Sequence, residues 1–285
     1  MKTVLVLGAS GMLGNAVLRL FAQSTGYHTL GTVRSDRAMR LLPQALHDAL
    51  LAGVDVENFD SVARGIAQAR PNVVINCVGV VKQLSEADDP LTAIPINSLL
   101  PHRLARLCEL ANARLVHIST DCVFSGSKGG YLETDFPDAN DLYGRSKYLG
   151  EVDYAHAVTL RTSIIGSELD GARSLLCWFL AQREPVRGFT KAVFSGLSTF
   201  ELARVIRDFV LPDPSLRGLY HVSAEPITKY DLLKLVAREY GKSTEITPCA
   251  EVAVDRSLDS TRFRSVTDYA PPPWPELVRR MREFG

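Results

Sequence analysis

The stretch TVLVLGASGMLGNAVLRLFAQ, residues 3–23, decides the fold. Residues 3–9 are a short apolar run rich in β-branched side chains, and residues 11–23 change to the period of an amphipathic helix. Gly8, Gly11 and Gly14 lie between them in a GxxGxxG spacing. A glycine loop that joins a strand to a helix lets a pyrophosphate approach the backbone, where free N–H groups and the positive end of the helix dipole meet it. The stretch therefore predicts a dinucleotide-binding unit.

Tight packing of a helix on a strand is the alternative explanation for such glycines. The position of the motif at the start of an alternating chain favours cofactor binding. We expect the cofactor to contact the loop at Gly8, Ser10, Gly11, Met12, Leu13 and Gly14, with the Ser10 hydroxyl adding a hydrogen bond to the phosphates.

The rest of the first half alternates between apolar runs and helical patterns. Strands are expected at residues 28–33, 49–56, 72–79, 114–120 and 157–163, and helices at 59–69, 96–112 (interrupted by Pro101) and 143–155. Fully apolar strands separated by helices indicate a parallel sheet that is covered on both faces. With right-handed crossovers, this pattern predicts an α/β fold of the doubly wound Rossmann type.

After about residue 165 the alternation loosens. Helices are expected at 173–182, 197–210 and 228–241, the last with Thr228 as N-cap and Gly241 as its stop; a strand is expected at 216–224, and a short final helix follows the prolines near 271–275. We expect a main domain over residues 1–165, to which segments around 190–222 return. A smaller substrate-binding lobe is expected over residues 166–285.

Composition excludes several classes of partner. Among the 285 residues, Lys+Arg and Asp+Glu both total 32, so no basic field favours nucleic acid. The five cysteines are widely spaced without a CxxC pair, which is typical of a reducing compartment. No apolar run is long enough to span a bilayer, and the N-terminal run is too short for a signal peptide. We expect a cytoplasmic protein with no membrane partner, and a homodimer only as a general prior.

Arg34 bears on the choice of cofactor. The second strand ends near Val33, about 20 residues past the glycines, where NAD-selective proteins place an acidic residue. A guanidinium at this position suits a 2′-phosphate through bidentate hydrogen bonds. NADPH is therefore the expected cofactor, and nearby Asp36 leaves NADH open. An ordinary solvated arginine is the alternative.

The stretch DLYGRSKYLGE, residues 141–151, places Tyr143 and Lys147 four positions apart, on one face of a helix. A phenol with an ordinary pKa of about 10 is a poor acid or base at neutral pH, and a nearby ammonium lowers that pKa. Ser119 and Thr120 leave the end of a buried strand, where doubly wound sheets bind ligands. A threonine hydroxyl there donates to a carbonyl oxygen that becomes an alkoxide.

These motifs make the chain similar to the extended short-chain dehydrogenases/reductases, and most similar to the dTDP-4-dehydrorhamnose reductase branch. The stretches that carry the resemblance run almost from end to end: VLVLGASGMLG, ARLVHISTDCVFSG, YLETDFPDANDLYGRSKYLGE, TLRTSIIG, SGLSTFELARVI and RSLDSTRF. The glycine and YxxxK motifs are shared by the wider superfamily, whereas STDxVFxG and LDSTRF point to the narrower branch.

The resemblance implies a role for each matching position. Tyr143 is the expected proton donor, Lys147 its partner and Thr120 the third catalytic residue. Asn97 matches a helix residue that supports a proton relay and contributes to the cofactor site, as Tyr143 and Lys147 also do. The positions that match adenine and nicotinamide contacts are Asp55, Val56, Cys77, Val78 and Gly79. The substrate is expected against Lys82, Thr120, Asp121, Cys122, Tyr143, Thr162, Trp178 and Arg256.

At two positions the sequence differs from the pattern of this branch, and these differences leave the identity of the substrate sugar undetermined. Cys122 stands where an aromatic residue is common, and Lys82 lies in an altered loop, where it either contacts a diphosphate or sugar substituent or is merely solvated. Trp178 either lines the pocket or packs in the core, and Arg256 either meets the substrate or anchors the C-terminal lobe. His117 is expected to be a packed core histidine, and Cys122 a small packing residue.

We expect an NADPH-dependent reductase of the C4 ketone of a nucleotide-linked 4-keto-6-deoxyhexose. Cys122 argues against a 4,6-dehydratase, which would carry an acidic residue there. A 4-epimerase of the same superfamily is the enzyme alternative. The non-enzyme alternative is a cofactor-binding regulatory subunit that resembles the β-subunit of methionine adenosyltransferase.

Overall fold

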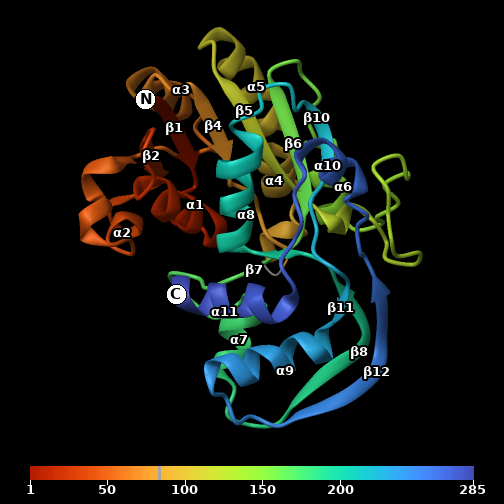
Figure 1. Ribbon diagram of the computed structural model, residues 1–285. Coiled ribbons are helices and arrows are strands. Elements are labelled where there is room, and N and C mark those ends of the chain that lie inside the picture. The colour runs from red at the N-terminus through yellow and green to blue at the C-terminus, as the bar shows by residue number, and fades with distance from the viewer. Residues whose placement is uncertain (83–84) are drawn as a thin grey trace.

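The computed structural model describes residues 1–82 and 85–285 and is built on a seven-stranded sheet in which every neighbouring pair of strands is parallel (Figure 1). Its strands are short and apolar, and all six residues of the strand Ala157–Thr162 are buried. Burial on both faces explains the continuous apolar runs. The strands are β1 Lys2–Leu7, β2 Tyr27–Val33, β3 Leu50–Ala52, β4 Val73–Asn76, β5 Arg114–Thr120, β6 Ala157–Thr162 and β10 Gly218–His221.

The strand order is β10-β6-β5-β4-β1-β2-β3, so the winding reverses between β1 and β4. In open parallel sheets ligands bind beyond the carboxyl ends of the strands at such a reversal. The Rossmann-type α/β fold expected from the sequence is confirmed, and the reversal marks the edge where its site is to be sought.

Helices cover both faces of this sheet (Figure 1). Buried residues of α1 and α8 belong to one apolar cluster with one face of the sheet, and those of α3 and α5 belong to a second cluster on the other face. The helices of this part are α1 Met12–Ala22, α2 Asp36–Met39, α3 Phe59–Ala69, α4 Pro90–Ala93, α5 Leu100–Leu110, α6 Leu142–Leu149 and α8 Thr199–Val205. Short 3₁₀ and π segments join them: η1 Gln44–Ala49, η2 Ser85–Ala87, η3 Ile94–Leu99, η4 Asp121–Val123 and η5 Ile206–Val210.

A second group of elements lies below the carboxyl edge of the sheet (Figure 1). The long strand β8 pairs in parallel with β12 and antiparallel with β11, and β7 pairs with β9. The strands are β7 Ile164–Ile165, β8 Val186–Phe194, β9 Leu197–Ser198, β11 Ile227–Thr228 and β12 Ile246–Asp255. The helices of this group are α7 Leu175–Ala181, α9 Lys229–Tyr240 and α11 Trp274–Phe284, whereas α10 Thr261–Thr267 lies beside β10 of the main sheet.

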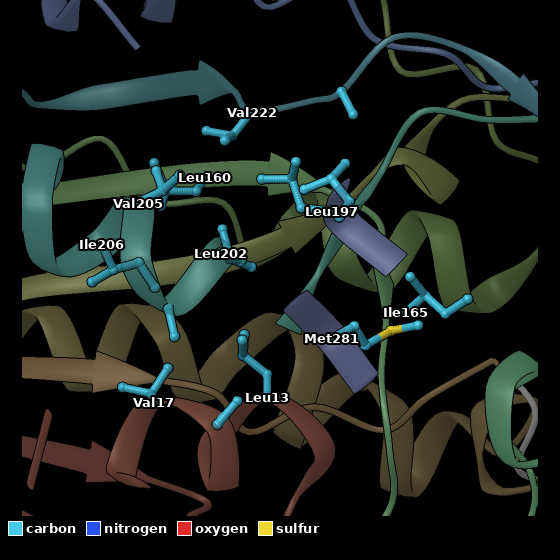
Figure 2. Close-up of a cluster of buried hydrophobic side chains, with 14 of the residues drawn as sticks. Leu13, Val17, Leu160, Ile165, Leu197, Leu202, Val205, Ile206, Val222 and Met281 are labelled. Carbon is cyan, nitrogen blue, oxygen red and sulfur yellow. The ribbon is translucent and has the colours of Figure 1, made fainter. Parts of the chain in front are cut away.

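One apolar core continues from the main sheet into this second group. Figure 2 shows Leu13 and Val17 of α1 in the same cluster as Leu160 of β6, Ile165 of β7 and Met281 of α11. Fully burying one such side chain stabilises a fold by about 1.5–3 kcal/mol. The two parts are therefore held against each other by packing as well as by the chain connections.

Several boundaries differ from those expected. The helix expected at 143–155 ends at Leu149, because Gly150 closes its last turn and the chain then leaves to enter β6. The strand expected at 49–56 stops at Ala52, since Gly53 adopts a φ of +75° that extended strands do not use.

The expected interruption at Pro101 was wrong. The helical run continues from η3 through Pro101 into α5 without a break, and η3, directly before the proline, is a π segment. In contrast, the boundaries expected for 228–241 are confirmed: the Thr228 hydroxyl accepts from the Asp231 amide, and Gly241 ends α9 in the left-handed conformation. In the described part of the chain, no helix is both long and apolar enough to cross a membrane.

Candidate active site at the carboxyl edge of the sheet

Helix α6 carries Tyr143 and Lys147 at the edge where the strands end. Asp141 is its N-cap, and its carboxylate accepts a hydrogen bond from the Gly144 amide at 2.7 Å. Gly144 packs directly on the segment after β5: a Cβ there would lie 2.3 Å from the carbonyl oxygen of Cys122. A glycine at this position thus brings the Tyr143 turn against the end of β5.

Lys147 is buried beneath this helix. Its Nζ donates to the carbonyl oxygen of Ile118 at 2.9 Å, which ties α6 to β5 two residues before Thr120. Burial lowers the pKa of the Lys147 ammonium from 10.5 to about 8, and the charge of Glu151 opposes this effect. The lysine is therefore fixed in place and still protonated at neutral pH.

Thr120 ends β5 and caps the turn that follows. Its hydroxyl accepts from the Cys122 amide at 3.1 Å and donates to a carboxylate oxygen of Asp121 at 3.1 Å. An interaction with Thr120 also acts to lower the pKa of the Tyr143 phenol, so the two side chains lie close together. The hydroxyls of Thr120 and Tyr143 are thus brought together from β5 and α6.

The expectation that the pKa of Tyr143 is lowered was wrong for this structure. Burial of the phenol raises its pKa above the ordinary value, and the nearby Cys122 and Asp121 add to the rise. The opposing effect of Thr120 is too small to reverse the rise. Tyr143 therefore keeps its proton at neutral pH, which suits a group that gives a proton rather than one that removes it.

Asn97 joins the loop after β4 to α6. Its Oδ1 accepts from the Val80 amide at 2.9 Å, and its Nδ2 donates to the Ser146 hydroxyl at 3.2 Å. Gly79 lies in the same loop, where a Cβ would be 3.4 Å from Asn97 Oδ1 and 3.8 Å from Lys147 Nζ. Cys77, Val78 and Gly79 therefore lead from β4 to Lys147, the route expected for the nicotinamide side of a cofactor site.

The glycine loop lies beside this site, at the end of β1. Gly8 has a φ of +78°, and a Cβ on Gly14 would lie 2.1 Å from the carbonyl oxygen of Gly8. Helix α1 begins at Met12 with Gly11 as N-cap, and no side chain within residues 1–82 and 85–285 caps it. The first N–H groups of α1, next to Ser10, Met12 and Leu13, therefore remain as donors for an anion.

The expected adenine-side residues lie at the far end of the same edge. Arg34 directly follows β2 and is exposed, and no carboxylate of the described residues lies within ion-pair distance of it. Asp55 follows β3, where its amide is bonded to the Ser61 hydroxyl at 2.9 Å, and Val56 packs partly into the core. The acidic residue near Arg34, Asp36, starts α2 after the Ser35 N-cap.

The expected substrate residues divide into two groups. Asp121 and Cys122 lie beside Tyr143, and the positive charge of Arg256 acts to lower the pKa of both. The Nε of Arg256 donates to the Phe124 carbonyl at 2.7 Å. Lys82 pairs with Asp141 at 2.5 Å, next to the start of α6. Burial raises the pKa of the Cys122 thiol to about 12, so it remains a neutral packing group.

Thr162 and Trp178 lie outside this group of contacts. Thr162 lies on β6, is buried, and is the register partner of Thr120 on β5. Trp178 is about one third exposed (37%) on α7, whereas its neighbour Phe179 is fully buried. His117 is fully buried, and its Nδ1 lies 3.1 Å from Asn76 Nδ2. The core position expected for His117 is therefore confirmed.

Three polar residues around the site were not singled out from the sequence. Asp141 caps α6, and Glu151 follows the same helix, where it forms a bidentate ion pair with buried Arg161 of β6. Glu151 lies four residues after Lys147, a spacing that was available in the sequence. Its ion-pair partner Arg161 could not be found in this way, because only the sheet register brings the two residues together.

The sheet reversal, the glycine loop and the Thr120–Tyr143–Lys147 grouping are those of an extended short-chain dehydrogenase/reductase. The family model described as RmlD substrate binding domain matches residues 1–282, and the chain belongs to this family.

Two similar proteins carry different names. Methionine adenosyltransferase 2 subunit beta of Danio rerio is 30% identical over an alignment of 270 positions that spans 88% of this chain and 78% of that protein. A dTDP-4-dehydrorhamnose reductase of Aggregatibacter actinomycetemcomitans is 23% identical over an alignment of 310 positions that spans all of both chains. The solved structure of dTDP-4-dehydrorhamnose reductase from Bacillus anthracis str. Ames in complex with NADP has a TM-score of 0.80 and 22% identity, and covers 99% of each chain.

Proposed function

We propose that this protein is an NADPH-dependent reductase of the C4 ketone of a nucleotide-linked 4-keto-6-deoxyhexose. The observation that carries the proposal is the grouping of Thr120, Tyr143 and Lys147 at the end of β5: Tyr143 interacts with Thr120, and buried Lys147 is bonded to the Ile118 carbonyl two residues earlier. A relative of full matching length that is named dTDP-4-dehydrorhamnose reductase supports the substrate class.

The residues present fit a dinucleotide. Gly8, Gly11 and Gly14 leave the start of α1 open, and its uncapped N–H groups would hold the pyrophosphate. Arg34, exposed and without a carboxylate partner among the described residues, would bind the 2′-phosphate. Asp55 and Val56 would hold the adenine, and Cys77, Val78 and Gly79 would line the nicotinamide side. Asp36, close to Arg34, leaves binding of NADH open.

The bound cofactor would supply a hydride to the ketone carbon. Tyr143 would give its proton to the ketone oxygen, so that hydride and proton together convert C=O to CH–OH. Thr120 would donate a hydrogen bond to the same oxygen as negative charge develops on it. Lys147 would supply a fixed positive charge and bind the nicotinamide ribose, and Asn97 would hold the loop after β4 against α6.

The substrate would lie against the residues that follow β5 and precede α6. Asp121, Cys122 and Arg256 would contact the sugar, and Lys82, at the Asp141 end of α6, would reach a diphosphate or sugar substituent. Thr162 and Trp178 are proposed for the sugar-nucleotide side. In this proposal residues 1–165 form the cofactor domain and 166–285 mainly the substrate lobe; a cytoplasmic homodimer remains the expected form.

A regulatory role is the second candidate, because a methionine adenosyltransferase β-subunit is 30% identical to the chain. The presence of Thr120, Tyr143 and Lys147 in one group, with Thr120 and Lys147 buried and Tyr143 half-buried, favours catalysis. An epimerase of the same superfamily would keep its cofactor through each cycle. Arg34 supports an exchangeable NADPH instead.

The experiment is a substrate panel. NADPH oxidation would be followed with dTDP-, UDP- and GDP-linked 4-keto-6-deoxysugars, each made in place by a matching dehydratase, with Tyr143→Phe alongside. Turnover with one nucleotide series, lost in the variant, supports the proposal. Tight NADPH binding without turnover on any member would remove the reductase assignment for these sugars and favour the regulatory role.

A further inference from the structure

A row of buried polar side chains crosses three neighbouring strands just below the site. Ser119 of β5 is the register partner of Arg161 on β6, and Arg161 is the register partner of His221 on β10. Arg161 and His221 have exposed fractions of only 2% and 0%. The row lies one residue before Thr120 and Thr162, so it supports the strand ends that carry the site.

Glu151 joins this row to the catalytic helix. One of its oxygens accepts from the Ser119 hydroxyl at 2.7 Å and from Arg161 Nε at 2.6 Å, and the other accepts from a terminal Arg161 nitrogen at 2.6 Å. The Glu151 amide also donates to the Tyr148 carbonyl at 3.1 Å, at the end of α6. The carboxylate is therefore held by three hydrogen bonds at a fixed place after Lys147.

The other end of the row reaches the second lobe. Arg161 can only donate, so its contact of 3.2 Å makes His221 Nε2 an acceptor, and Nδ1 then donates to the Tyr131 carbonyl at 3.0 Å. Burial and the charge of Arg161 lower the pKa of His221 to about 3, which agrees with this neutral form. Tyr131 bridges to Leu258, close to Arg256.

The row of polar side chains, through Glu151, affects the charge state of Lys147. A buried ammonium is costly unless an opposite charge faces it. The other titratable groups around it are held neutral: burial lowers the pKa of His117 on β5, raises that of Cys77 after β4 to about 12, and raises that of Tyr143 on α6. The carboxylate of Asp121 faces Arg256. Glu151 is the charge that favours the Lys147 ammonium: its carboxylate is bonded to the Ser119 hydroxyl, and Lys147 Nζ is bonded to the carbonyl of the preceding residue, Ile118.

We propose that Glu151, clamped by Arg161 and Ser119, is a positioning residue that keeps Lys147 as an ammonium against the Ile118 carbonyl. Its kinetic consequence rests on the proposed reductase function; its effect on Lys147 does not.

The test measures the titration of Lys147 directly. NMR of protein labelled with ¹³C and ¹⁵N in its lysines would give the Lys147 midpoint, assigned with Lys147→Arg, in the wild type and in Glu151→Gln. We expect the midpoint to fall from about 8 by about one pH unit. The matched control is Glu201→Gln, because Glu201 is a buried glutamate that, like Glu151, is paired with an arginine, Arg204, but lies on α8. The control should leave the Lys147 midpoint unchanged.

Loss of one partner of a buried ion pair can prevent folding. If Glu151→Gln does not fold, Glu151→Gln/Arg161→Met removes both charges and decides the question, with a smaller downward shift expected because the positive charge of Arg161 is removed as well. A folded variant with the wild-type midpoint, or a control that shifts it equally, would overturn the proposal.

A second readout uses turnover. The basic limb of kcat should move to lower pH in the Glu151 variant while KM for the substrate is unchanged. If the wild type shows no turnover on any sugar nucleotide, the proposed function fails, and the NMR titration still judges the role of Glu151.

Discussion

The carboxylate of Asp141 is shared between the Lys82 ammonium and the first turn of α6. Its Oδ2 lies 2.5 Å from Lys82 Nζ, and its Oδ1 accepts from the Gly144 amide at 2.7 Å. Although burial raises the pKa of Asp141, these two hydrogen bonds hold it below its usual value. One side chain therefore fixes both the start of the helix with Tyr143 and the loop after β4.

Asp141→Ala should lower the free energy of unfolding by about 1 kcal/mol, because the helix loses its N-cap. Asp141→Asn keeps a capping oxygen and loses only a partly exposed ion pair, so its loss should be within about 0.5 kcal/mol. Urea unfolding measures both. Equal destabilisation by Asn and Ala would show that the ion pair with Lys82, rather than the cap, is the main contribution.

Gly144→Ala should reduce kcat by about 100-fold. The new Cβ would meet the Cys122 carbonyl at 2.3 Å, and because that neighbour is backbone, α6 must move and take Tyr143 away from Thr120. Tyr148→Ala, on the exposed side of the same helix, is the control and should keep most activity. A Gly144→Ala protein with wild-type kcat would contradict the placement of α6.

Arg34→Ala should weaken NADPH far more than NADH. Loss of a charge-assisted hydrogen bond to a 2′-phosphate costs about 1.5–3 kcal/mol, or roughly 10-fold to 100-fold in KM for NADPH. KM for NADH, which lacks that phosphate, should change little. Arg37→Ala is a suitable control, because Arg37 already has a carboxylate, Asp170, at 3.9 Å. Equal losses for both cofactors would remove Arg34 from the 2′-phosphate site.

The buried Lys147 predicts how stability depends on pH. Its folded pKa of about 8 lies below the ordinary value of 10.5, so between these values the unfolded chain binds more protons. The cost of burying the ammonium is therefore present in full below about pH 8 and is relieved as the pH rises above it.

Lys147→Met removes this cost. Its gain in unfolding free energy over the wild type should be largest near pH 7 and should shrink by pH 9.5, before tyrosines of the unfolded chain ionise. Urea unfolding at a series of pH values measures the difference. A gain that stays constant with pH would mean that Lys147 is not titrating in this window.

The order of the helices and strands could be predicted because it follows from the local spacing of apolar residues. The strand expected at 114–120 and the helical pattern at 59–69 match β5 and α3 residue for residue. Thr228 and Gly241 carry their own start and stop signals, so both ends of α9 could also be predicted. Such features depend on neighbouring residues alone.

Features that depend on tertiary contacts could not be predicted. The pairing of Glu151 with Arg161 is one such feature, because Arg161 is ten residues away on another element. The raised pKa of Tyr143 comes from burial, which the YxxxK spacing does not encode. Parallel pairing of β8 with β12 joins strands that are separated by α9, and no local pattern indicates it.

Transfer of a labelled hydride tests the proposed reaction most directly. NADPH deuterated at the transferable C4 position would be incubated with the protein and a nucleotide-linked 4-keto-6-deoxyhexose, and the product analysed by mass spectrometry. We expect one deuterium at C4 of the sugar with the wild type and at least about 100-fold less with Tyr143→Phe at equal time. A protein that binds NADPH but leaves the deuterium on the cofactor, with every sugar nucleotide of the panel, would contradict the reductase function.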